Sequence, residues 1–357
     1  MRIRPYYVHH MSLLCRELEV YLRRFYRSDC HLSLFGSAGN GFGLLGSDAD
    51  ICLRFGPEDI DSAEVICKVA EVIRKMPDIS FICEIPHAKV PIVKFRCHNH
   101  DHLEADLSLY NVLALENTRL LRTYSKLDRR IHQLGIMTKV WAKNCEIGNA
   151  SKGSLSSYSY IIMLIHYLQR TNPPVAPFLQ EVVPLKRCRE PVIIGNCDVY
   201  FCCLEDLEWA VHNRSTVGEL WIGFLDYFGT KFDFTREVVQ IRQTLPLMKL
   251  DKGWQSRPIA IEDPFDLAHN LSSGVHSKTM AYIQKSFIQS LEKFSTLSVP
   301  NSKLNHNAFV LYASLLLASC RVGDGPPLDC NCCHRCRQIG HFVVNCPLGM
   351  KDKKRNK

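Results

Sequence analysis

Three aspartates are spaced as ligands for a pair of hard cations. Asp48 and Asp50 are separated by one residue and lead into an apolar, β-branched run that is typical of a strand. Because side chains alternate between the two faces of a strand, both carboxylates point to one face. Asp106 lies on the polar face of a second strand-like run, Leu103 to Leu109. Carboxylate oxygens are the ligands that Mg²⁺ prefers, and a pair of such ions can promote in-line transfer at phosphorus.

A glycine-rich loop, GSAGNGFG from Gly36 to Gly43, comes just before the first two aspartates. Such a backbone can approach a bulky polyanion closely and offer it N–H groups. Tight turns and close packing also use glycine, so the loop alone does not decide the function. A loop followed by two carboxylates on one face is more specific, and it predicts a phosphate cradle beside a metal site. The competing interpretation is three solvated carboxylates at a strand end.

The composition is that of a globular protein that can bind nucleic acid. The chain has 357 residues, of which 46% are hydrophobic and 22% are charged, and this length predicts two or three domains. Its 44 Lys and Arg exceed its 36 Asp and Glu, a net charge of +8 that permits a nucleic-acid partner. The N-terminus lacks an apolar core of signal-peptide length, and no apolar run is long enough to cross a membrane. We therefore expect an intracellular protein.

Seventeen cysteines raise the question of disulfides and metal sites. Most lie singly within apolar runs, as Cys52 and Cys97 do, and there we expect buried, reduced thiols. Four others lie close together in a strand-like region without paired metal spacing, so we do not expect a metal among them: Cys188, Cys197, Cys202 and Cys203.

The elements that must position the aspartates follow from periodicity and from capping residues. Strands are expected at His31 to Phe35, directly after Asp50, and at Ile79 to Ile85, Val90 to Arg96 and Leu103 to Leu109. Helices are expected at residues 10–27, after an Asp61-Ser62 cap, and at residues 111–144, 156–170, 216–227 and 279–293. The first part of the chain is therefore mixed, whereas the second part is mostly helical.

Six blocks along the chain resemble the terminal nucleotidyltransferases, relatives of DNA polymerase β. They are FGSAGNGFG, SDADICL, ADLSLYNVLALENT, KGSLSSYSY, GELWIGFLDYFGTKFDF and IEDPFDLAHN. Among these enzymes the sequence is most similar to the zinc-knuckle terminal uridylyltransferases, which add uridines to RNA 3′ ends. The resemblance implies an α+β fold: a polymerase β-like domain with a mixed sheet, a mostly helical central domain and a C-terminal zinc knuckle.

The resemblance also implies domain boundaries. We expect an N-terminal helix at residues 1–29 that packs on the central domain, a nucleotidyltransferase domain at 30–115, a helical central domain at 116–320, a linker at 321–329, a zinc knuckle at 330–347 and a basic tail at 348–357.

By the same resemblance, each part of the nucleotide has its contacts. Asp48, Asp50 and Asp106 would hold two Mg²⁺ (or Mn²⁺) ions, while the RNA 3′-hydroxyl attacks the α-phosphorus and pyrophosphate leaves. The remaining contacts comprise phosphate contacts from the loop, at Phe35, Gly36 and Ser37; triphosphate contacts from Lys139, Lys143 and Ser157; ribose and uracil contacts from Asn111 and Asn117; and base stacking by Tyr158. Without the resemblance, the lysines are equally well read as a solvated helix face, and Tyr158 as a half-buried core aromatic.

The block IEDPFDLAHN bears on the choice of base. In uridylyltransferases a histidine at the position of His269 contacts uracil and crowds out adenine, while carboxylates at Asp263 and Asp266 orient the loop. A lone histidine is more often a satisfied surface or core residue, and it is the surrounding block that favours the functional interpretation.

Near the C-terminus the spacing CxxCxxxxHxxxxC predicts a zinc knuckle. Its ligands are Cys333, Cys336, His341 and Cys346, three thiolates and an imidazole that close a tetrahedral shell around Zn²⁺. Cys330 and Cys332 lie just before the first ligand, but only the pair at 333 and 336 keeps the full spacing. Such knuckles bind single-stranded RNA, so we expect this one to assist RNA binding and to be dispensable for chemistry.

Three hypotheses remain from the sequence. The first is a cytoplasmic RNA uridylyltransferase that uses UTP and acts on single-stranded RNA 3′ ends, with no DNA or membrane partner. The second is a poly(A)-adding enzyme on the same fold, and the third is an inactive RNA-binding scaffold. The three aspartates disfavour the scaffold, and His269 disfavours the adenylyl enzyme.

Overall fold

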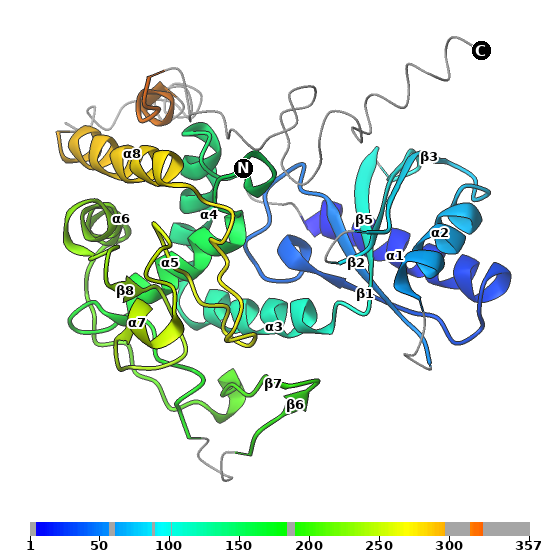
Figure 1. Cartoon of the computed structure of the whole chain (residues 1–357), viewed down its shortest axis with the longest axis horizontal. Coiled ribbons are helices and arrows are strands. Elements are labelled where there is room, and N and C mark those ends of the chain that lie inside the picture. Colours follow the sequence, from blue (N-terminus) through cyan, green and yellow to red (C-terminus); the bar gives the residue numbers. More distant parts are fainter. Residues whose placement is uncertain are drawn as a thin grey trace. The chain divides into compact units, whose positions relative to one another are not determined.

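The chain forms two compact units (Figure 1). The computed structural model describes residues 5–56, 61–87, 90–100, 102–183, 190–296 and 315–323. The sheet unit comprises residues 1–132 and 184–206, and the helical unit comprises residues 133–183 and 207–357. The expected boundary at residue 115 therefore lies inside the sheet unit, which keeps the helix that follows its last strand.

The sheet unit is built on a mixed five-stranded sheet, as the sequence predicts. Its strands are β1 (His31–Phe35), β2 (Ala49–Arg54), β3 (Ile79–Ile85), β4 (Ile92–Cys97) and β5 (Leu103–Leu109), in the order β1-β2-β5-β4-β3. The pair of β2 and β5 is parallel, and the other pairs are antiparallel. Alternation along β5 buries Leu103, Ala105 and Leu107 and leaves Glu104 exposed and Asp106 half-buried on the other face.

The helices of this unit are α1 (Pro5–Phe25), α2 (Ser62–Ile73) and α3 (Val112–Leu127), with short 3₁₀ turns η1 (Gly36–Ala38) and η3 (Leu204–Asp206) and a small ribbon of β6 (Ile193–Ile194) and β7 (Cys197–Asp198). The predicted cap of α2 is confirmed, because the Asp61 carboxylate accepts hydrogen bonds from the N–H groups of Ala63 and Glu64.

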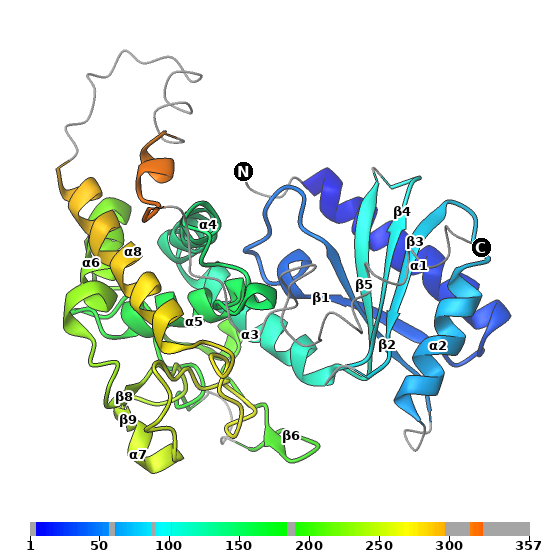
Figure 2. The same cartoon turned by 45° about the horizontal axis from the view of Figure 1, so that its top comes forward.

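The N-terminal helix packs on the sheet, where we had expected it to pack on the helical domain. Met11, Leu14 and Leu18 of α1 are fully buried in one core with the apolar face of the sheet and with α2. Both views show α1 running along the sheet (Figure 2). Deleting the helix would therefore expose the core beneath the aspartate-bearing strands.

The helical unit is organised around an aromatic core. Its main helices are α4 (Arg129–Asn144), α5 (Ser157–Gln169), α6 (Val217–Asp226), α7 (Lys249–Lys252) and α8 (Ser277–Ser295). Shorter elements are η2 (Ala150–Lys152), the π-helical turn η4 (Tyr227–Lys231) and the paired β8 (Glu237–Val238) and β9 (Leu247–Met248). Trp141, Trp221, Phe224, Phe228 and Phe287 make ring contacts with one another and are buried.

One predicted helix is in fact two. The periodic stretch 111–144 breaks at Asp128, which has an extended backbone (φ −145°, ψ 132°) between α3 and α4. The Asp128 carboxylate accepts hydrogen bonds from the backbone N–H and the guanidinium of Arg130, and so caps the start of α4. Burial raises the pKa of this carboxyl, but the bonds from Arg130 outweigh it and hold the pKa below its ordinary value.

The cysteines in the described parts of the chain are free thiols, and Cys52 and Cys97 are buried as expected. Cys197 lies in β7, whereas Cys202 and Cys203 lie outside any strand; Cys188 is outside the described residues. No helix among the described residues has both the length and the apolar character needed to span a bilayer.

Candidate active site

The parallel pairing of β2 with β5 brings two of the predicted aspartates together. Asp50 and Asp106 are partners in the register of this pair, so their side chains leave the same face at adjacent positions. Asp48 lies two residues before Asp50, just ahead of the first residue of β2. Ala49 and Ala105 form the preceding pair in this register, and both are buried on the opposite face. The strand register therefore places Asp50 and Asp106 on one face of the sheet, as expected from the alternation of side chains. We call four residues the acidic face: Asp48, Asp50, Asp106 and Glu104.

Two cations from the neighbouring strand already lie among these acidic groups. Lys94 of β4 pairs in register with Asp106, and its ammonium forms a salt bridge with that carboxylate. Arg96, two residues further along β4, forms the equivalent pair with Glu104. Sequence reasoning missed Lys94, although a signal existed: in IVKFRC the cations alternate with apolar residues, as the acids do in LEADLSL.

The acidic face has donor groups that suit a divalent cation. The pKa of Asp48 is raised, first by desolvation and then by repulsion from Asp106 and Glu104, while Lys94 opposes the shift. A hard cation would relieve this crowding of carboxylates. Among the residues that the structure describes, no three acidic, imidazole or thiol side chains form a ready-made cluster, and the ammonium of Lys94 contacts one oxygen of Asp106.

The first glycine of the loop lies directly against Asp50. Gly36 has φ +63°, and a Cβ at this position would lie 2.1 Å from Oδ2 of Asp50. Its N–H donates a 2.8 Å hydrogen bond to Oγ1 of Thr118, whose hydroxyl donates in turn to the Ala114 carbonyl of α3. Sequence reasoning missed Thr118, which ties the loop to a helix begun more than seventy residues later. Gly36 is thus required both by its backbone conformation and by the carboxylate beside it.

The other predicted contact residues of the sheet unit lie on β1, in η1, or in α3 and its N-cap. Phe35 is the register partner of Asp50, and Ser37 is half-buried in η1. Asn111 occupies the N-cap position of α3, and Asn117 precedes Thr118 in the same helix. Every predicted site residue of this unit therefore lies on β1, β2, β5, η1, α3 or at the end of one of them.

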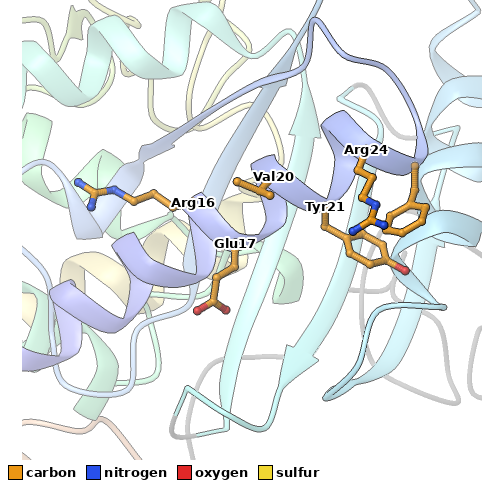
Figure 3. A pocket seen from close by; sticks show the side chains of 6 residues that line it. Arg16, Glu17, Val20, Tyr21 and Arg24 are labelled. Atoms are coloured by element: carbon orange, nitrogen blue, oxygen red, sulfur yellow. The ribbon is translucent and has the colours of Figure 1, made fainter.

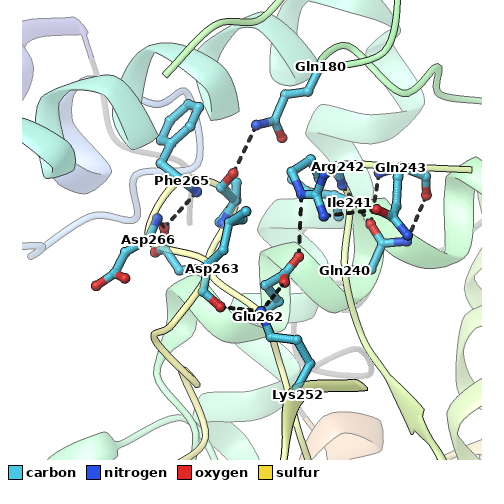
Figure 4. A network of polar contacts seen from close by, with 12 residues as sticks. Gln180, Gln240, Ile241, Arg242, Gln243, Lys252, Glu262, Asp263, Phe265 and Asp266 are labelled. Atoms are coloured by element: carbon cyan, nitrogen blue, oxygen red, sulfur yellow. Dashed lines mark hydrogen bonds and ion pairs between the residues drawn. The ribbon is translucent and has the colours of Figure 1, made fainter. Parts of the chain in front are cut away.

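In the helical unit, Asp263 organises the loop that ends at His269 (Figure 4). Its Oδ1 accepts hydrogen bonds from the N–H groups of Phe265 and Asp266, both 3.0 Å. Its own N–H donates to the His269 carbonyl, and the His269 N–H donates to the Asp266 carbonyl at 2.8 Å. Burial raises the pKa of the Asp263 carboxyl, and the two accepted backbone bonds oppose that shift.

Tyr158, on the first turn of α5, also contacts this loop. Its hydroxyl donates a 3.4 Å hydrogen bond to Oδ2 of Asp263, and burial together with that carboxylate raises its pKa well above the ordinary value. The hydroxyl therefore stays a donor at any physiological pH. Its neighbour Ser157 is the first residue of α5.

The two predicted lysines of α4 differ in exposure. Lys139 is buried, with 8% of its surface exposed, whereas Lys143 in the last turn of the helix is exposed. The helical unit therefore carries Lys139, Lys143, Ser157, Tyr158, Asp263, Asp266 and His269, and the sheet unit carries the aspartates and the loop. The predicted zinc ligands Cys333, Cys336, His341 and Cys346 lie outside the described residues, as do the basic tail and the part of the expected linker after residue 323.

A hollow on the surface of the sheet unit involves none of these residues. It follows the exposed side of α1 and is lined by Arg16, Glu17, Val20, Tyr21, Arg24 and Phe25 (Figure 3). All six belong to one helix, so the hollow is a feature of the helix surface.

Two protein-family profiles match the chain. The profile described as "Poly(A) RNA polymerase, mitochondrial-like, central palm domain" covers residues 5–126, and "Cid1 family poly A polymerase" covers residues 216–269. The first profile starts where α1 starts, in agreement with the packing of that helix on the sheet.

Solved structures match over most of the chain. The Cid1 poly(U) polymerase with Mg and 3′-dATP bound has a TM-score of 0.75 and 30% sequence identity, and the match covers 84% of this chain and 92% of that one. This chain belongs to the Cid1 family of poly(A) and poly(U) polymerases. A further solved structure, described as that of a cytoplasmic RNA terminal U-transferase, has a TM-score of 0.75 and 31% identity over 88% of this chain and 94% of that one.

Curated relatives of this Cid1-family chain are longer proteins. Terminal uridylyltransferase 4 of Mus musculus is 40% identical over 98% of this chain, and terminal uridylyltransferase 7 of Homo sapiens is 40% identical over 94%. The poly(A) RNA polymerase GLD2-B of Xenopus laevis is 36% identical over 69%. The chain spans 21% and 23% of the length of the two uridylyltransferases and 48% of that of GLD2-B.

Gly36→Ala tests the contact between the loop and Asp50. We expect nucleotidyl transfer to fall by about 10²-fold or more, because the added methyl group displaces a carboxylate whose position the chemistry requires. The matched control is Gly46→Ala, which has a similar φ of +77° but nothing within 4 Å of the added Cβ. Steady-state rates of the two variants, with circular dichroism to verify folding, make the comparison. Equal losses in both would attribute the effect to backbone strain and contradict the contact.

Proposed function

We propose that this chain is an RNA terminal uridylyltransferase that transfers UMP from UTP to RNA 3′ ends and releases pyrophosphate. The observation that carries the proposal is 40% identity to terminal uridylyltransferases 4 and 7 over 94–98% of the chain. The poly(A) polymerases of the GLD2 group are less similar, at 33–36% identity over 69–78%. A cytoplasmic location is part of this proposal, and one solved RNA terminal U-transferase is likewise described as cytoplasmic.

In the proposed chemistry, the aspartates of the acidic face bind metal ions. Asp48, Asp50 and Asp106 would hold Mg²⁺ or Mn²⁺, which when bound neutralises the triphosphate and lowers the pKa of the RNA 3′-hydroxyl. The loop at Gly36 and Ser37 presents N–H and hydroxyl donors for the outer phosphates. Gly36 also leaves the room that the Asp50 carboxylate occupies. The task of the protein is positioning and charge neutralisation, since phosphoryl transfer asks for little covalent participation by side chains.

The helical unit would recognise the nucleotide. In this proposal Lys139, Lys143 and Ser157 bind the triphosphate and Tyr158 stacks on the base. Asn111 and Asn117 of the sheet unit would bind the ribose and the uracil edge. A hydroxyl that donates to Asp263 restrains the ring of Tyr158, which lowers the entropy lost on stacking.

His269 would select the base. It lies at the end of a turn closed by hydrogen bonds of Asp263 and Asp266, so its backbone has a defined position. An imidazole held there can contact uracil and leave too little room for a purine. The Cid1 structures concerned with UTP selectivity include a His-to-Asn variant bound to MgATP, which supports a histidine in this role.

A labelled RNA oligonucleotide incubated with each nucleoside triphosphate separately, in Mg²⁺, tests the proposed function. We expect extension with UTP well above that with ATP. Preferential extension with ATP would favour the poly(A) alternative, and no extension with any nucleotide would favour the scaffold.

Asp106→Ala should keep the fold and lose the reaction. Removing one ligand of the metal site is expected to cost about 10³-fold or more in rate. Glu104→Ala is the matched control, because Glu104 lies on the same strand and the same face and has a side chain that is 52% exposed. Single-turnover extension with UTP measures both variants. Activity near that of the unsubstituted chain in a folded Asp106→Ala protein would refute the metal assignment.

His269→Asn should shift base choice towards ATP. A lost hydrogen bond and a lost steric wall are each worth about 1–3 kcal/mol, so the UTP/ATP ratio of kcat/KM should fall at least about tenfold. His276→Asn provides the control, because this exposed histidine also belongs to the helical unit and precedes α8. If the ratio is unchanged in His269→Asn, another residue selects the base.

The zinc knuckle is proposed as an aid to RNA binding. Cys333, Cys336, His341 and Cys346 have the residue types and spacing of a closed Zn²⁺ site. Deleting residues 330–357 should raise the KM for RNA and shorten the tails, with the UTP/ATP ratio unchanged, because the knuckle would bind RNA and not nucleotide. Tail lengths on denaturing gels and kinetics at increasing RNA concentration measure this. Complete loss of uridine addition at saturating RNA, in a folded protein, would show that the segment is needed for chemistry.

A further inference from the structure

One lysine outside the IEDPFDLAHN block contacts the loop at two points. Lys252, the last residue of α7, has a side chain only 18% exposed. Its ammonium donates a 2.8 Å hydrogen bond to Oε1 of Glu262 and a second bond to the carbonyl of Leu267 (Figure 4). The same nitrogen lies 4.9 Å from the centre of the Trp254 ring. The cation therefore joins the beginning of the loop to a residue two positions before His269.

Glu262 makes this contact obligatory. It is 1% exposed, and a carboxylate so deeply buried needs a cation close by. Within the described residues its other oxygen, Oε2, has no hydrogen-bond partner and only an ionic contact with Nε of Arg242 at 3.7 Å. Lys252 thus supplies the closer of two compensating charges.

The loop between these anchors is a closed turn. Glu262 is fixed to Val239 through its backbone N–H, and Gln180 donates a 2.9 Å hydrogen bond to the carbonyl of Pro264. Two backbone hydrogen bonds close the segment from Asp263 to His269: the Asp263 N–H donates to the His269 carbonyl, and the His269 N–H donates to the Asp266 carbonyl. A rigid turn places its last residue only as accurately as its base is held, and Lys252 holds the base and the far side together.

We propose that Lys252, paired with Glu262, is a positioning residue for base selection; this inference rests on the proposed function of His269. Lys252 acts through the backbone of the turn. An imidazole that serves as a steric wall loses discrimination when the turn moves, because misplacement by about 1 Å can change a rate about 10²-fold.

The test uses a variant that removes the ion pair without leaving a buried charge. Lys252→Met alone strands the Glu262 carboxylate and can unfold the loop, so it is combined with Glu262→Gln. Lys252→Arg is the conservative variant, and Lys278→Met removes an exposed lysine of α8 as the control. Each variant is measured with UTP and with ATP, in the unsubstituted background and in the His269→Asn background.

We expect Lys252→Met/Glu262→Gln to lower the UTP/ATP ratio of kcat/KM about tenfold, as His269→Asn does, and to add nothing in the His269→Asn background. Lys252→Arg should retain most of the ratio, and Lys278→Met all of it. An unchanged ratio in the folded double variant would overturn the inference. An equal fall in both backgrounds would also overturn it, because Lys252 would then act independently of His269.

Hydrogen exchange provides a readout that does not depend on the nucleotide. The N–H groups of Asp263 and His269 close the turn, so their exchange should accelerate at least about fivefold in the double variant, with α5 unchanged. If the unsubstituted chain does not prefer UTP, the proposed function fails, and the exchange result alone decides whether Lys252 holds the turn. Unchanged exchange at residues 263–269 would reject that role.

Discussion

The register between two parallel strands is the constraint on which the site depends. A shift of β2 by one residue against β5 would turn Asp50 into the core and expose Ala49, so the metal site and the hydrophobic core specify the same pairing. The buried faces of β2, β4 and β5 rest on α1 and α2, which join them in one core. The position of the carboxylates is therefore held by apolar contacts on the far side of the sheet.

The loop in the helical unit is held by a different kind of interaction. Around Asp263 and Glu262 the polar groups are buried, and hydrogen bonds to their side chains fix the backbone in addition to the packing of the buried Ile261 and Phe265. Hydrogen bonds suit a recognition element because they restrict both the distance and the angle between donor and acceptor. Apolar contacts restrict the relative position of two side chains less strictly. The two units thus use different means for the tasks proposed for them, which are chemistry on the sheet and base selection on a hydrogen-bonded turn.

Local patterns predicted much of this, and they failed where the answer depended on distant partners. The alternation in LEADLSL was enough to place β5 and its polar face, and Asp61 was enough to start α2. Periodicity was enough to predict a helix near the N-terminus but not what covers it, and the packing partner implied by the resemblance was wrong. The break at Asp128 was missed because apolar periodicity continues across it without Gly or Pro. Thr118 and Lys252 were missed because their partners, Gly36 and Leu267, are identified only by the folded backbone.

The salt bridge between Lys94 and Asp106 means that the acidic face has a counter-ion within the protein itself. If Asp106 holds a divalent ion as proposed, the ammonium of Lys94 would compete with that ion for the same carboxylate. The net affinity for the ion would then be a difference between two attractions, and without the ion Lys94 offsets part of the repulsion that Asp48 receives from Asp106 and Glu104. Such a site would be more stable without the ion, at the expense of metal affinity. It would favour an ion that arrives bound to a triphosphate, because the lysine could then pair with the negative charge of the phosphates.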